Sequence, residues 1–241
     1  MKMHVLPGEA QHKEFTEAGI EGEVIVCNEA FISGPIDTSD IDLFWDERAN
    51  FIFTEYGEDP IEYHEKVADE LARLDDVTAD ADVTLWFEYE LFCSVNMWFC
   101  LDRLKVSGAS VYRAAPKNLS PENIWDGFAG HDAAMLRDCF DARIQFSEED
   151  IAVGSRLWQA YGKRDHETLR ELSEYRSPCF PFLKEVCLAA VEIDTRPLEV
   201  VADIKAEGIT EFDKVFTEFR RRAGVYGFGD VQVEQIMKNL V

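Results

Sequence analysis

The chain has 241 residues, of which 46% are hydrophobic and 30% charged, and its formal net charge at pH 7 is −24. This length and composition are typical of a globular protein with one large domain or two of ordinary size. No apolar run reaches the roughly 18 residues of a membrane-spanning helix, and the first residues lack the long apolar stretch of a secretory signal. We therefore expect a cytoplasmic protein without membrane contact.

The negative charge is uneven: residues 1–146 carry a net −19 and residues 147–241 a net −5. Nucleic acids and anionic membranes bind cationic surfaces, so this charge disfavours both as partners of the first half. An acidic surface is equally typical of proteins from salt-adapted cells. The six cysteines form no CxxC pair and have no closely spaced histidines, so neither a zinc ribbon nor a redox motif is indicated.

Four β-rich runs alternate with helical patterns in the first half of the chain. They begin at Met3, Glu23, Val83 and Ser110. Continuous apolar strands separated by helices are typical of a parallel sheet that is covered on both faces. We therefore predict an α/β fold whose N-terminal domain, residues 1–120, contains a Rossmann-like parallel sheet of about four strands.

Residues 121–241 read as a helical C-terminal domain that packs on the first. Two helical patterns between Pro197 and Phe219, followed by the glycine-rich turn 225–230, resemble a winged helix. A DNA-reading helix is basic, whereas the arginines at 220–222 are offset by nearby acidic residues and fit the end of an ordinary helix equally well. A packing module is therefore favoured over a DNA reader.

Three helix starts carry capping signals. Ser39 with Asp42 and Ser147 with Asp150 have the spacing of a capping box, and Asp59 stands before a proline that suits the first helical turn.

Acidic residues follow three of the predicted strands. Because the carboxyl ends of parallel strands lie along one edge of a sheet, and ligands bind there, we expect these residues to share a crevice. A group of carboxylates is suited to acid–base chemistry or to a divalent metal. We predict Glu29, Glu88 and Glu90 as catalytic residues, and as the ligands of a divalent metal if the protein binds one.

Five further residues are predicted to contact the ligand in this crevice: Gly8, Glu9, Gly34, Arg48 and Asn96. In this interpretation Arg48 neutralises an anionic group of the ligand. A local structural role is the alternative for each carboxylate: Glu90 could cap the helix that begins at Leu91, and others could pair with Arg48.

Familiar catalytic motifs are absent from the sequence. There is no GxxxxGK[ST] or GxGxxG phosphate loop, no GxSxG elbow and no HExxH pair. A P-loop ATPase and a dinucleotide-dependent dehydrogenase are therefore disfavoured.

Several segments together resemble a bacterial family known as domain of unknown function 1835. They are HVLPGEA (4–10), GEVIVCNEAFISGP (22–35), FWDERANFI (44–52), LWFEYELFCSVN (85–96) and GFGD (227–230). The family pattern has Asn-Gly-Asp after the first strand, an acidic residue before a Gly-Pro on the second and Trp-Phe-Glu-X-Asp on the third. At these places this chain has Pro7-Gly8-Glu9, Glu29 with Gly34-Pro35, and Trp86-Phe87-Glu88-Tyr89-Glu90. The resemblance implies a Rossmann-like N-terminal part and a helical C-terminal part, and it brings no established activity.

Two functional hypotheses follow. The first is a hydrolase or transferase that acts on a small phosphorylated or nucleotide-like molecule in the acidic crevice. The second is a ligand-binding or regulatory module without catalysis, in which the helical tail transmits occupancy to a partner. The sequence does not determine the oligomeric state.

Overall fold

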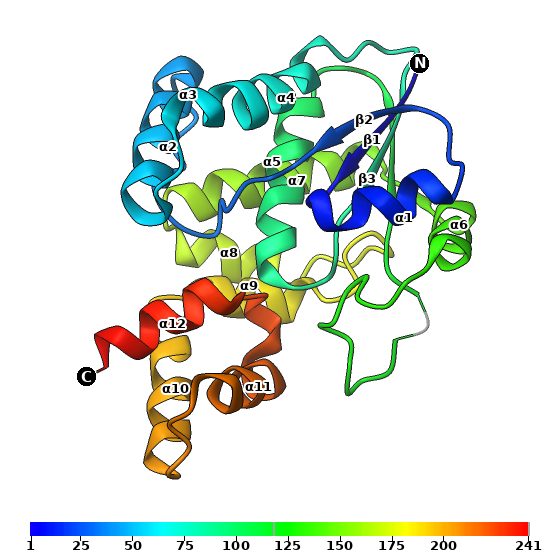
Figure 1. Cartoon of the computed structure of the whole chain (residues 1–241). Helices are drawn as coiled ribbons and strands as arrows, with labels where there is room; N and C mark the ends of the chain where they lie inside the picture. Colours follow the sequence, from blue (N-terminus) through cyan, green and yellow to red (C-terminus); the bar gives the residue numbers. More distant parts are fainter. Residues whose placement is uncertain (118, 241) are drawn as a thin grey trace.

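The computed structural model describes residues 1–117 and 119–240, which form a five-stranded sheet with helices on both faces (Figure 1). The strand order is β2-β1-β3-β4-β5; the first four strands are parallel and β5 is antiparallel to β4. Their bounds are β1 Lys2–Leu6, β2 Glu23–Val26, β3 Asp82–Trp86, β4 Ser110–Ala114 and β5 Ile144–Gln145. The predicted α/β fold is confirmed. The sequence did not indicate β5, because two residues carry no periodic pattern.

Helices make up most of the remaining chain, and no helix of the described residues is long and apolar enough to cross a bilayer. Single turns of 3₁₀ or π helix occur at η1 Glu9–Gln11, η2 His64–Ala68, η3 Arg73–Asp76 and η4 Gly224–Tyr226. The α-helices are α1 His12–Glu17, α2 Ile41–Tyr56, α3 Pro60–Tyr63, α4 Asp69–Ala72, α5 Leu91–Leu104, α6 Ala133–Asp141, α7 Glu148–Gly162, α8 His166–Leu172, α9 Leu183–Val191, α10 Arg196–Ala206, α11 Phe212–Ala223 and α12 Asp230–Asn239.

The two faces of the sheet bury separate cores because side chains alternate along each strand. On β1, Val5 joins the large core that α5 covers, whereas Leu6 joins a smaller core under α1 and α6 (Figure 1). The large core continues without a break into the C-terminal helices, and Trp158 of α7 packs edge-on against Phe99 of α5 with ring centroids 5.2 Å apart. The sheet and its core therefore extend past residue 120.

The strand order creates a switch point between β1 and β3. From β1 the chain crosses to β2 through α1 on one face, whereas from β3 it crosses to β4 through α5 on the other face. The two connections leave the neighbouring strands in opposite directions, which opens a crevice at their carboxyl ends. Residues that directly follow β1 and β3 are thus placed where α/β proteins bind ligands.

The capping signals were mostly confirmed. Asp59 accepts the backbone N–H of Ile61 at 2.8 Å, and Ser147 and Asp150 form the reciprocal capping box of α7. The start of α2 was predicted wrongly by one residue, because Asp40 caps it instead of Ser39 and accepts the N–H of Leu43 at 3.1 Å. Within the described part of the C-terminal half, turn 225–230 contains no strand and leads directly into α12, so it is not a β wing.

Helices α5 and α7 approach closely at Gly154, where an added Cβ would lie 2.4 Å from Cδ1 of Leu101. We expect Gly154→Ala to reduce the free energy of unfolding by roughly 1 kcal/mol, because overpacking of about 1–3 kcal/mol exceeds the helix-propensity gain of about 1 kcal/mol. Urea denaturation measures the change. The control is Ala152→Gly on the exposed side of α7, which reports the propensity difference alone. A variant at Gly154 more stable than the wild type would contradict the close contact.

Candidate functional site

Two carboxyl groups meet in the short connection between β3 and α5, beside the switch point. Carboxylate oxygens of Glu88 and Glu90 and the thiol sulfur of Cys93 lie within 4.8 Å of one another. Glu90 is buried and Glu88 is partly buried. We call Glu88 and Glu90 the carboxyl pair; they are the two residues that the sequence placed after the third strand.

Backbone donors fix both members of the carboxyl pair. Glu90 caps α5 and accepts the N–H of Cys93, at 2.9 Å from Oε2 and 3.2 Å from Oε1. Oε1 of Glu88 accepts the N–H of Phe128 at 2.7 Å. The capping role foreseen as an alternative for Glu90 is therefore confirmed, and it holds the carboxyl group in one orientation.

Burial changes the acidity of the pair. It raises the pKa of Glu90 to about 8, with a further contribution from the negative charge of Glu88, while the hydrogen bonds from Cys93 oppose the increase. Burial also raises the pKa of Glu88, but the Phe128 N–H and the positive charge of Arg220 counteract it. At neutral pH the pair therefore holds a proton, chiefly on Glu90, beside a more acidic carboxyl group. Such a difference supplies an acid and a base in one place.

The carboxyl pair lines a cavity of about 210 Å³ between the end of β3 and the C-terminal helices. We call this cavity the carboxyl pocket. Arg220 of α11 reaches its wall and forms an ion pair with Asp126 at 2.7 Å. Other lining residues include Trp125, Phe216, Phe219, Gly224, Gly227 and Phe228. The pocket thus combines three carboxyl groups, those of Glu88, Glu90 and Asp126, with the guanidinium group of Arg220.

Two glycines let the chain approach the carboxyl pair. Gly127 and Gly227 have φ of +62° and +67°, and an added Cβ would lie 1.9 Å from Cδ of Glu88 and 2.2 Å from Oε2 of Glu90, respectively. Glycine is needed at both positions for conformation and for space. The turn at residues 225–230, which resembles a wing in its sequence, therefore covers Glu90.

Glu29 lies in a different cluster. Its carboxylate is completely buried and pairs with the guanidinium of Arg48, and it also accepts the Tyr63 hydroxyl and the Ala30 N–H, the latter at 2.6 Å. Among the described residues it does not belong to the group formed by Glu88, Glu90 and Cys93. Glu29 therefore does not share a site with Glu88 and Glu90, and the alternative of a pair with Arg48 is confirmed for it.

Arg48 is fully buried and serves the loop that follows β2. Besides Glu29, its guanidinium donates to the carbonyl oxygens of Ala30, Ser33 and Pro35. Its hydrogen-bonding capacity is thereby directed at the protein itself. The guanidinium that lines the carboxyl pocket is that of Arg220, not that of Arg48.

The remaining predicted ligand contacts are spread over the same edge and do not line the carboxyl pocket. Gly34 has φ +83°, and an added Cβ would lie 2.6 Å from Nη1 of Arg48. Asn96 Nδ2 donates to the carbonyl oxygen of Glu29 at 2.7 Å. Glu9 is exposed, with its carboxylate 3.6 Å from His12, and Gly8 before it is extended at φ 178°. In the described residues, then, Gly34 and Asn96 support the loop after β2.

A wider groove of about 740 Å³ lies outside the carboxyl ends of β1 and β2. Pro7, Asn28, Tyr63 and Phe92 line it, and Glu58, Asp59 and Glu62 add negative charge. The backbone of Glu29 borders this groove, although its side chain has no exposed surface. The groove therefore borders β1 on its β2 side, and its lining residues differ from those of the carboxyl pocket.

Sequence reasoning missed Asp126, Gly127 and Arg220. They come from a loop and a helix that are distant in sequence from the strands, and no spacing rule connects them to Glu88. The GFGD segment was the one signal that pointed to this region.

The carboxyl pair and Cys93 offer a different metal-ligand set from the predicted one. Glu29 is replaced by the Cys93 thiol, so the set has two carboxylates and one sulfur. Zn²⁺ accepts sulfur and oxygen ligands together, whereas Mg²⁺ prefers oxygen ligands. Burial and the neighbouring carboxylates raise the pKa of Cys93 well above its usual value. The thiol would therefore lose its proton only when a metal ion binds to the sulfur.

Comparisons with known proteins identified no relative of this chain. No family model matches the chain, and neither a curated protein nor a solved structure matches it. The resemblance to domain of unknown function 1835 therefore stays a prediction from the motifs.

The raised pKa of Glu90 predicts a pH-dependent stability. Because the folded-state pKa of about 8 exceeds the usual 4.5, the folded chain retains a proton that the unfolded chain has released between these pH values. The free energy of unfolding then falls as pH rises, by up to about 1.4 kcal/mol per pH unit. We expect Glu90→Gln to remove this fall. The free energy of unfolding of the variant, relative to that of the wild type, should therefore increase from pH 4.5 to 8 and stay constant above pH 8.

Urea denaturation between pH 5 and 9 measures the difference between the two proteins. Glu9→Gln, at an exposed carboxylate on the same edge, is the matched control and should follow the wild type. Parallel curves for wild type and Glu90→Gln would show that Glu90 is ionised at neutral pH.

The buried ion pair predicts a large loss on removing one partner. Arg48→Met leaves the Glu29 carboxylate buried without its cation, and we expect a loss of about 3–5 kcal/mol in the free energy of unfolding. The double variant Glu29→Gln/Arg48→Met should recover part of this loss. Arg103→Met, in a more exposed pair with Asp75, is the control and should change stability much less. Equal losses of unfolding free energy in Arg48→Met and Arg103→Met would contradict the stabilising role of the buried pair between Arg48 and Glu29.

Proposed function

We propose that the protein is a hydrolase or transferase that acts on a small anionic molecule in the carboxyl pocket. The observation that supports this most is the position of one buried and one partly buried carboxyl group, with unequal acidity, beside the switch point of a parallel sheet. A phosphorylated substrate agrees with the guanidinium of Arg220 on the pocket wall.

Each charged group has a distinct role in this proposal. Glu88, the more acidic member, accepts a proton from the attacking water or hydroxyl group. Glu90, protonated at neutral pH, donates a proton to the leaving group. Arg220 binds the anionic end of the substrate, and this contact replaces part of its ion pair with Asp126.

The size of the pocket limits the substrate. About 210 Å³ is below the roughly 300 Å³ at which cavities begin to hold drug-sized ligands. The pocket therefore suits a small molecule or the reacting end of a larger, nucleotide-like one. If Zn²⁺ binds Glu88, Glu90 and Cys93, it would add Lewis-acid activation at the same place.

Ester hydrolysis tests the proposal. Turnover of p-nitrophenyl phosphate, bis(p-nitrophenyl) phosphate and p-nitrophenyl acetate is measured with EDTA, Mg²⁺ or Zn²⁺. We expect Glu88→Gln to lower the rate by roughly 10²–10⁴-fold, the usual contribution of a positioned base. Arg220→Ala should raise KM for the phosphate esters but not for the neutral acetate. The rate should decline above about pH 8, as Glu90 loses its proton.

Glu9→Gln, outside the pocket, is the control for a general change of surface charge. Turnover that survives Glu88→Gln would overturn the assignment of the carboxyl pair.

Ligand sensing is the second candidate, and the contact between Gly227 and Glu90 favours it. A ligand that displaced this turn would act on η4 and α12, which flank it. Binding of a phosphate ester without turnover, with affinity unchanged in Glu88→Gln, would favour sensing over catalysis.

A further inference from the structure

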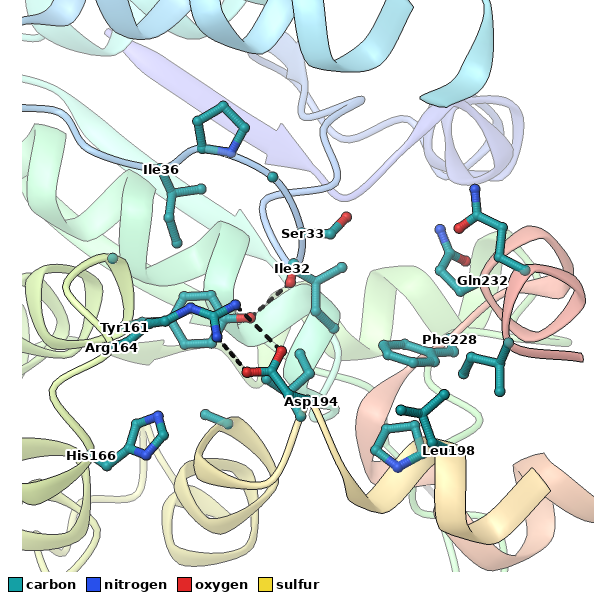
Figure 2. Close-up of a pocket in the computed structure, with 18 of the residues that line it drawn as sticks. Ile32, Ser33, Ile36, Tyr161, Arg164, His166, Asp194, Leu198, Phe228 and Gln232 are labelled. Carbon is teal, nitrogen blue, oxygen red and sulfur yellow. Dashed lines mark hydrogen bonds and ion pairs between the residues drawn. The ribbon is translucent and has the colours of Figure 1, made fainter. Parts of the chain in front are cut away.

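A second cavity, with a volume of about 550 Å³, lies between the loop after β2 and the helices α7 to α10 and α12 (Figure 2). We call it the helical cavity. Its volume falls within the range of sites that enclose small organic ligands. Neither member of the carboxyl pair lines it, and Phe228 is the residue that borders both this cavity and the carboxyl pocket.

The walls of the helical cavity are mainly apolar, with polar groups at two opposite ends. Ile32, Leu198 and Phe228 belong to the apolar part, whereas Arg164 and Asp194 lie at one end and Gln232 at the other (Figure 2). Apolar walls with a few placed polar groups are characteristic of ligand sites. A ligand that fits has an apolar body with hydrogen-bonding groups at both ends.

Helix α12 presents uncharged hydrogen-bonding groups to the cavity. Gln232, Gln235 and Asn239 recur at helical spacing and all line it. A carboxamide has both a donor and an acceptor, which allows paired hydrogen bonds to the edge of a nucleobase. Gln232 is partly engaged, because its Oε1 accepts the N–H of Gly229 at 3.0 Å. Gln235 and Asn239 are therefore the groups assigned to recognition.

The charged groups at the other end are one guanidinium and two carboxylates. The guanidinium of Arg164 forms an ion pair with Asp194, with Nη2 3.3 Å from Oδ1 in addition to the shorter contact through Nη1. Asp37 adds a further negative charge to the lining. A phosphate group would meet two carboxylates there, whereas ribose hydroxyls could donate to Asp194 and accept from Arg164. An uncharged ligand is therefore favoured.

The backbone of Arg164 is unusual. Among the described residues it is the one non-glycine with positive φ, at 53°. It follows the end of α7, where the N–H of Asp165 donates to the carbonyl of Ala160 at 2.8 Å, and glycine is the usual residue at such a position. Backbone conformation alone would favour glycine, and an exposed ion pair stabilises little. Neither the backbone conformation nor the ion pair therefore accounts for an arginine at this position.

We propose that the helical cavity binds an uncharged ligand of the nucleoside class. Gln235 and Asn239 contact the base edge, Phe228 contacts the ring, and Arg164 with Asp194 contacts the sugar hydroxyls. A hydroxyl of Ser33, buried at this wall without a protein partner among the described residues, offers one more hydrogen bond. This site is independent of the reaction proposed for the carboxyl pocket.

Isothermal titration calorimetry of the full chain with adenosine, guanosine, cytidine and uridine tests the proposal, with the corresponding 5′-monophosphates beside them. We expect saturable binding of at least one nucleoside, with weaker binding of its monophosphate. Arg164→Gly should lower the affinity at least tenfold while the melting temperature is maintained or raised, since glycine suits the positive φ. The double variant Gln235→Ala/Asn239→Ala should also lose at least tenfold.

Two controls separate this site from other effects. Arg156→Ala removes an exposed arginine on α7 that is outside the cavity, and Glu88→Gln alters the carboxyl pocket; both should bind the nucleoside as the wild type does. The proposal is overturned if no nucleoside binds up to millimolar concentration, if the monophosphate binds more tightly, or if affinity survives both cavity variants. Failure of ester turnover leaves these outcomes unchanged, so the two proposals are tested separately.

Discussion

Burying an ionised carboxylate requires a compensating charge or a proton. The chain satisfies this requirement in two different ways at the same edge of its sheet. Glu29 is paired with a cation, because Arg48 contacts it together with the Tyr63 hydroxyl and the Ala30 N–H. Glu90 instead accepts the N–H of Cys93, and burial and the charge of Glu88 raise its pKa to about 8. The first arrangement fixes a loop, and the second creates a group that can exchange a proton.

The carboxyl pocket also explains how the two halves of the chain depend on each other. Its walls come from the connection after β3, from the loop around Asp126 and from helix α11 with the turn at Gly227. Because Gly127 and Gly227 lie directly on the carboxyl pair, the loop and the turn bury part of its surface. The acidity of the pair is therefore a property of the assembled fold and not of the β3–α5 connection alone.

The two cavities differ in chemistry although Phe228 borders both. The carboxyl pocket is small and charged, whereas the helical cavity is larger and mainly apolar, and its arginine is paired with Asp194. Such a division suits a reaction on a small anionic group in one place and recognition of an uncharged molecule in the other. Helix α12 and the turn before it connect the two places through the residues from Gly227 to Asn239.

Patterns in the amino-acid sequence were sufficient to predict the parallel sheet, the helix starts after Asp59 and Ser147 and the position of Glu88 and Glu90 after β3. These features depend on patterns within one segment, such as apolar runs and capping residues next to the helices that they cap. The pairing of Glu29 with Arg48 and the position of Arg220 in the wall of the carboxyl pocket depend instead on the packed structure. The partners come from separate elements, and their distance depends on how helices pack on the sheet. Burial, which sets the acidity of Glu90, is likewise a property of all the segments around it and of no single one.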